Sequence, residues 1–158
     1  MIRAVLETPH VIVGAAIALK TGNPALAIPL SLLSHFVLDE TPHWNPHLTS
    51  VQGKINKIDP KSLGLIILDS SVALVSGSVI ALSFMPDVGK TALVLTCCFL
   101  AVLPDLIEAP YIFLGYKKEW LRKWLFFQKT HQFNTNVVWG VSTQIITVAA
   151  AVWWMIQK

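Results

Sequence analysis

Apolar stretches alternate with short polar breaks along the whole chain, and the breaks carry signals for the start and end of helices. Thr8-Pro9 is a cap followed by a first helical residue, and Gly22 ends the apolar run that follows after about a dozen residues. A second run covers 25–38 and must end before Pro42, which disfavours helix in the residue ahead of it. Each run is shorter than the ~20 residues that a spanning helix needs. We therefore expect an N-terminal helical hairpin that reaches partly or wholly across a membrane.

Three later apolar stretches are long enough to span a bilayer by themselves: 63–85, 92–114 and 133–156. The polar stretch 41–60 is expected to be a loop, and the basic, Trp-rich stretch 117–129 is typical of a segment at the headgroup interface. No internal repeat or second domain is evident. The pattern predicts an all-α polytopic membrane bundle, a hairpin plus three spanning helices, in a single membrane-embedded domain over residues 1–158.

Composition narrows the class further. The chain is 54% hydrophobic and only 13% charged, with a mean hydropathy of +0.60, which excludes a disordered chain and argues against an ordinary soluble domain. In the predicted topology nine of the twelve Lys and Arg residues lie on one side of the membrane. The net charge of +3 is therefore explained by the positive-inside rule rather than by nucleic acid as a partner. We expect an integral protein of a bacterial inner membrane, with its basic side in the cytoplasm and membrane lipid as its partner.

Carboxylates inside the apolar stretches need an explanation, because a charge at the centre of a spanning helix costs roughly 2.5–3.5 kcal/mol on insertion scales. The chain reverses direction at every span, yet seven acidic and histidine side chains in and beside the helices share one depth, near the basic side. These side chains are His10, His35, Asp39, Asp69, Asp105, Glu108 and His131. All seven side chains can bind metal ions, so their common depth indicates a metal site.

Local spacing supports this interpretation. His35 and Asp39 are four residues apart, and Asp105 and Glu108 are three apart, so each pair shares one helical face and can reach one ion. His43 follows a proline and could fold back towards the first pair. Two divalent cations would neutralise the four intramembrane carboxylates. Zinc, manganese or iron suits a mixed imidazole and carboxylate set, whereas calcium or magnesium would not need three histidines.

The run Ser-His-Phe-Val-Leu-Asp-Glu-Thr-Pro-His-Trp at 34–44, together with His10 and the Leu-Pro-Asp ending at Asp105, resembles the YdjM-like family of predicted membrane-bound metal-dependent hydrolases. More distantly, the His-x-x-x-Asp step followed by Pro and His is similar to zinc-dependent phospholipase C and related nucleases. The resemblance implies His10, His35, Asp39 and Asp105 as metal ligands. The second His-x-x-x-acid pair of those enzymes is missing here, which favours one or two ions over three.

The sequence thus leads to a hydrolase that uses metal-activated water on a phosphoester or ester of a lipid or lipid-linked substrate. Glu108 or Asp69 is the candidate general base, whichever is not a ligand. Lys117 and Lys118 are candidates for holding an anionic lipid headgroup. Two alternatives from other classes stay open: a metal or proton carrier, and a non-catalytic membrane protein with a structural metal.

Overall fold

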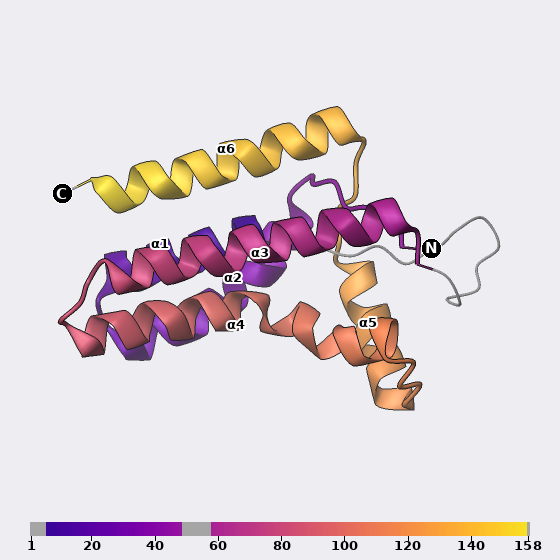
Figure 1. Ribbon diagram of the computed structural model, residues 1–158, viewed down its shortest axis with the longest axis horizontal. Coiled ribbons are helices and arrows are strands. Elements are labelled where there is room, and N and C mark those ends of the chain that lie inside the picture. The colour runs from indigo at the N-terminus through magenta and orange to yellow at the C-terminus, as the bar shows by residue number, and fades with distance from the viewer. Residues whose placement is uncertain (1–5, 49–57, 158) are drawn as a thin grey trace.

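The computed structural model describes residues 6–48 and 58–157, and these fold into helices joined by short connections (Figure 1). The predicted loop 41–60 is described only over its first eight and last three residues. The helices are α1 (Thr8–Thr21), α2 (Pro24–Glu40), α3 (Pro60–Leu82), α4 (Val88–Phe113), α5 (Glu119–Thr130) and α6 (Val137–Ile156). The all-α fold expected from the sequence is confirmed.

Helix α1 is the centre of the bundle and packs against α2, α3, α4 and α6. Small residues make this close packing possible. A Cβ added at Gly14 would lie 2.7 Å from the Cys97 carbonyl oxygen of α4, and Ala15 and Ala16 are fully buried. The approach of α1 to α4 matters for function, because each helix carries side chains of the candidate site near the same end of the bundle.

Helices α3, α4 and α6 are long and apolar enough to cross a membrane. Much of their apolar surface faces outward: Leu74 of α3 is 71% exposed and Val138 of α6 is 73% exposed. Side chains of this kind are stable in lipid and unfavourable in water. The features define an integral membrane protein, as the hydrophobic pattern predicted.

Three helix starts follow the caps that the sequence signals, but the expected cap at Thr8 is wrong: Thr8 is already the first residue of α1, Glu7 is the N-cap residue, and the Thr8 hydroxyl donates to the Asp69 carbonyl instead. Asn23, Asp59 and Asp87 each accept a hydrogen bond from a backbone N–H in the first turn of the helix that follows, and Gly22 ends α1 with a left-handed φ of 57°. Two starts differ by four residues from the predicted spans, and the first is α4, which begins at Val88 instead of 92. Helix α6 begins at Val137, because Asn136 accepts from the N–H of Trp139 and caps it there.

The segment ahead of α6 is extended instead of helical. His43 and Asn134 form a parallel bridge, in which the His43 N–H donates to the carbonyl of Phe133 and the Thr135 N–H donates to the carbonyl of His43. This pairing ties the start of α6 to the end of α2. It also brings the polar residues after α5 next to the candidate site.

The N-terminal ends of α1, α3 and α6 and the C-terminal ends of α2 and α4 lie at one end of the bundle, where α5 crosses it (Figure 1). Helix α5 is held there by the Trp124 indole, whose Nε1–H donates to the Pro104 carbonyl of α4 at 3.0 Å. The side chains singled out in the sequence analysis all belong to this end.

Candidate metal centre

Three helices bring donor atoms to one point. His10 near the start of α1, His35 in the last part of α2 and Asp105 in α4 each offer one ligand atom, and these atoms lie within 4.8 Å of one another. His35 is 0% exposed and His10 4%. Three of the metal-competent side chains that the sequence predicted from distant segments are thus brought together, and they could bind a metal ion.

Asp39 lies between the two histidines. Its Oδ1 is 3.6 Å from Nε2 of His10, and its Oδ2 is 3.5 Å from Nε2 of His35. Asp105 Oδ1 is 3.8 Å from the same His35 nitrogen. These separations exceed ordinary N–H···O hydrogen bonds of about 2.7–3.2 Å. They approach the roughly 3.3–3.6 Å between neighbouring ligands of a tetrahedral ion with bonds of about 2.0–2.2 Å.

The His35 ring gives the most specific indication. Its Nδ1 lies 2.8 Å from the carbonyl oxygen of Ala101, which can only accept, so Nδ1 carries a proton and donates. The other nitrogen, Nε2, faces only oxygens, of the Gln128 amide at 3.1 Å and of the Asp39 and Asp105 carboxylates. In a neutral ring Nε2 carries a lone pair. Because this lone pair and the surrounding oxygens repel one another, the arrangement is stable only with a proton or a cation between them. A ring whose other N–H is held by a backbone carbonyl is the usual state of a metal-ligating histidine.

Negative charge accumulates around this ring. Asp39, Asp105 and Glu108 gather at the centre, and burial raises the pKa of Glu7 well above its ordinary value, with the charge of Asp105 raising it further. Within the described part of the chain, no Lys or Arg forms an ion pair with any of these four acids. Buried oxygens on Asp39 (Oδ1) and Asp105 (Oδ2) have no hydrogen-bond partner among the described residues. A bound cation would satisfy both the charge and the oxygens.

Gln128 of α5 is a central residue of the site that the sequence analysis missed. Its Nε2 lies 2.7 Å from Oε1 of Glu108 and 3.2 Å from Oδ1 of Asp105, and its Oε1 lies 3.1 Å from His35. It is 1% exposed. A neutral amide in a basic, aromatic segment carries no sequence signal of metal chemistry. Which residue of α4 Gln128 lies against depends on the turn between α4 and α5.

Glu108 is buried beside the grouped donors. It lies one turn beyond Asp105 on α4, and the Gln128 amide connects it to the donor group without making it one of the grouped donors. Its role as general base stays a prediction.

Asp69 is hydrogen-bonded to the start of α1 and not to the grouped donors. Its Oδ2 accepts from the backbone N–H groups of Glu7 and Thr8, the latter at 3.3 Å, and its own carbonyl accepts from the Thr8 hydroxyl. The carboxylate of α3 therefore caps the N-terminus of α1, where negative charge is favourable. Its contacts give no support to the predicted role as general base, and it is not among the grouped donors.

Two predicted histidine ligands lie outside the group of three. His43 lines a small cavity with His10, and its Nδ1 lies 2.8 Å from the Thr41 carbonyl. His131 is exposed, with Nδ1 2.9 Å from the Phe127 carbonyl and its ring 4.5 Å from the Phe127 ring, at an angle of 43°. The next residue, Gln132, contacts a candidate ligand instead: its amide donates to Asp39 Oδ2 at 3.3 Å.

The two predicted headgroup lysines lie on the surface between α4 and α5. Lys117 Nζ donates to the Tyr111 carbonyl at 2.8 Å and lies 4.0 Å from the centroid of the Tyr111 ring, and Lys118 lies 5.6 Å from the centroid of the Tyr116 ring. Both lysines are exposed and belong to the end of the bundle that holds the metal centre. Their part in headgroup binding stays a prediction.

Fold and site together define a class: an integral membrane helical bundle with a buried His-His-Asp group able to bind a metal. No family model, no curated protein and no solved structure matches the chain significantly. The function must therefore be argued from the site itself.

Proposed function

We propose that the protein is a membrane-embedded, metal-dependent hydrolase that cleaves a phosphoester or ester bond in a lipid or lipid-linked substrate. The observation that carries the proposal is His35, whose protonated Nδ1 is fixed by a backbone carbonyl while Nε2 points at two carboxylates. His10, His35, Asp39 and Asp105 would hold one divalent ion, with zinc the best match to two imidazoles and two carboxylates. The motif resemblance to predicted membrane-bound hydrolases favours the same reaction class.

The chemistry divides between the ion and the chain. A bound divalent ion supplies Lewis acidity, which polarises the scissile group and makes water nucleophilic near neutral pH. Glu108 takes the proton of the attacking water and returns it to the leaving oxygen. The Gln128 amide, which donates to Glu108 and contacts Asp105 and His35, orients base and ligands relative to one another.

The location of the site favours a lipid substrate. The donor group lies at one end of a bundle whose helices expose apolar side chains, next to α5 with its exposed Trp120, Phe126 and Phe127. We place this end at the cytoplasmic face of a bacterial inner membrane, where basic residues favour anionic headgroups. Changing both Lys117 and Lys118 to Gln should lower activity on anionic lipids more than on neutral ones; an equal loss on both would contradict their role.

Metal content tests the centre directly. Elemental mass spectrometry of detergent-purified protein should find about one transition-metal equivalent in the wild type, and none in His35→Ala or Asp105→Asn. Glu40→Gln is the matched control, because Glu40 is exposed and adjoins Asp39 in the chain without belonging to the donor group. No metal in the wild type, before or after incubation with zinc, would refute the proposal.

Activity tests the reaction. The metal-loaded protein should hydrolyse members of a panel of phosphoester and carboxylester lipids in mixed micelles. Glu108→Gln should keep its metal but lose about 10²–10⁴-fold in turnover, the contribution of a positioned general base. Bound metal with no hydrolysis of any panel member would leave a structural site and exclude the enzyme, and unchanged turnover in Glu108→Gln would remove that residue from the mechanism.

A further inference from the structure

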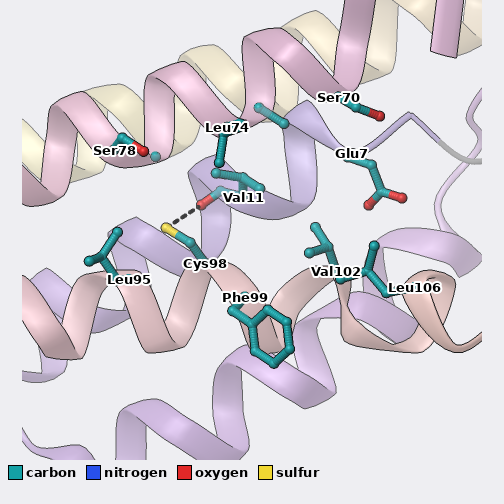
Figure 2. Close-up of a pocket in the computed structure, with 12 residues that line it drawn as sticks. Glu7, Val11, Ser70, Leu74, Ser78, Leu95, Cys98, Phe99, Val102 and Leu106 are labelled. Carbon is teal, nitrogen blue, oxygen red and sulfur yellow. Dashed lines mark hydrogen bonds between the residues drawn. The ribbon is translucent and has the colours of Figure 1, made fainter. Parts of the chain in front are cut away.

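A cavity of about 380 Å³ opens between α3 and α4 over α1. Figure 2 shows Leu95 and Ser78 at one end of it and Glu7 with Ser70 at the other. Its floor is made by small buried residues such as Val11, Gly77 and Cys98. The Cys98 thiol donates to the Val11 carbonyl. The lining is almost wholly apolar, except at the Glu7 end.

The dimensions of this groove fit one lipid chain. On α4 the lining runs from Leu95 to Leu106, about 16 Å at a rise of 1.5 Å per residue. One leaflet of hydrocarbon is about 15 Å, half of a ~30 Å core. The groove therefore extends from the depth of the metal centre to about the middle of the bilayer. Its volume falls in the range of ligand cavities.

The polar end of the groove lies beside the metal centre, although none of the grouped donors lines the groove itself. Leu106 follows Asp105 directly in α4, and Val102 precedes Asp105 by one turn. Glu7 lies close enough to Asp105 for the charge of one to act on the other. A chain lying in the groove would thus carry its attached polar group to the donor atoms.

From this continuity we propose that the groove between α3 and α4 binds a single acyl chain of an anionic lipid and places the scissile ester or phosphoester at the metal centre. The inference rests on the proposed function and names its substrate class. The groove is continuous with the lipid-facing surface, since the rim residues Leu74, Leu95 and Phe99 are exposed to the membrane, so a chain enters sideways from the same leaflet. Basic residues at that end of the bundle complement an anionic headgroup.

A second apolar cavity, about 430 Å³ between α1, α3 and α6, makes a natural comparison. Its polar end is formed by Asp69, whose carboxylate is already used to cap α1. No residue of α4 lines this second cavity, whereas the first groove is lined by the α4 residues on either side of Asp105. The proposal therefore commits to the groove on the α4 side.

The test is photocrosslinking with phosphatidylglycerol that carries a diazirine midway along one acyl chain, in vesicles containing the purified protein, followed by peptide mapping. We expect adducts to concentrate on Cys98, Phe99 and Val102. Ser78→Trp, which fills the groove, should reduce these adducts by about tenfold, the effect of excluding two methylene groups. Ser71→Trp is the matched control: Ser71 is exposed on the same helix, does not line the groove and bonds only to its own helix.

Adducts spread evenly over the outward faces of α3, α4 and α6 would show ordinary surrounding lipid and overturn the proposal, as would adducts confined to Val141, Ile145 and Val148 of the second cavity. The experiment is repeated with His35→Ala, which should bind no metal; groove adducts that persist in this variant show that the chain site does not depend on the metal. Groove adducts in a wild-type protein that binds no metal, even after incubation with zinc, would refute the hydrolase and leave the chain site intact. Hydrolysis of lipid by a protein whose adducts are evenly spread would refute the groove alone.

Discussion

Replacing Gln128 with Leu tests whether the amide organises the metal centre. Leucine fills a similar volume but cannot donate to Glu108 and Asp105, whose oxygens lie 2.7 and 3.2 Å from the amide nitrogen, and it lacks the amide oxygen that lies 3.1 Å from Nε2 of His35. Loss of one such outer partner of metal ligands typically weakens metal affinity by about 10–100-fold. Because this residue contacts two candidate ligands at once, we expect a zinc Kd near the upper end, equivalent to about 2–3 kcal/mol.

The measurement is competition for zinc between the detergent-purified protein and a chromophoric chelator. Gln144→Leu is the matched control, since Gln144 is also a glutamine with an amide hydrogen bond, to the Trp44 carbonyl at 3.2 Å, and it is not hydrogen-bonded to any of the grouped donors among the described residues. Its zinc affinity should match that of the wild type. Equal affinities in Gln128→Leu and wild type, with both folded by circular dichroism, would refute the positioning role of Gln128.

Three further outcomes are expected. His131→Ala should keep its metal in elemental analysis, because the ring bonds to its own helix and is exposed; loss of metal would restore the ligand role that the sequence suggested. Zinc at about 100 times its Kd should stabilise the protein by about 2.7 kcal/mol, seen as a rise in Tm that Asp105→Asn abolishes; an equal rise in that variant would place zinc elsewhere. Gly140→Ala should destabilise the protein by about 1–3 kcal/mol, since its Cβ would overlap the Trp44 backbone and lie 2.6 Å from the His43 carbonyl carbon. Gly64→Ala, whose Cβ would lie in open space, should leave the stability unchanged. Equal unfolding midpoints for the two variants would disprove the close packing of α6.

Most of the fold could be predicted because its signals are local. Asn23, Asp59 and Asp87 lie where a cap is needed and accept the expected backbone hydrogen bonds, so those helix starts were predicted to within a few residues. Length and apolar content identified the spans for the same reason. The start of α6 was misplaced because residues ahead of Asn136 pair with the segment at His43, and a long-range pairing of this kind leaves no periodicity in the chain.

The candidate site was predicted in part. His10, His35 and Asp105 could be grouped from depth alone, because reversal of the chain at each span fixes which ends meet. Depth does not fix the direction in which a side chain points. Asp69 and His131 share that depth, yet one turns to the first turn of α1 and the other to the surface.

The buried carboxylates of the candidate centre couple metal binding to the stability of the fold. Asp39 and Asp105 are buried at a point where neither forms an ion pair with a Lys or Arg of the described chain, and both retain an oxygen without a hydrogen bond among the described residues. Carboxylates in this state oppose folding unless they are protonated or bind a cation. Metal binding should therefore contribute to folding, and removing one ligand should have two opposite effects. Asp39→Asn should lower metal affinity while raising the stability of the metal-free protein, because it removes one of the mutually repelling charges. A structural salt bridge would behave in the opposite way, since loss of either partner destabilises it, and the sign of this change in metal-free Tm distinguishes an ion-binding centre from an ion pair.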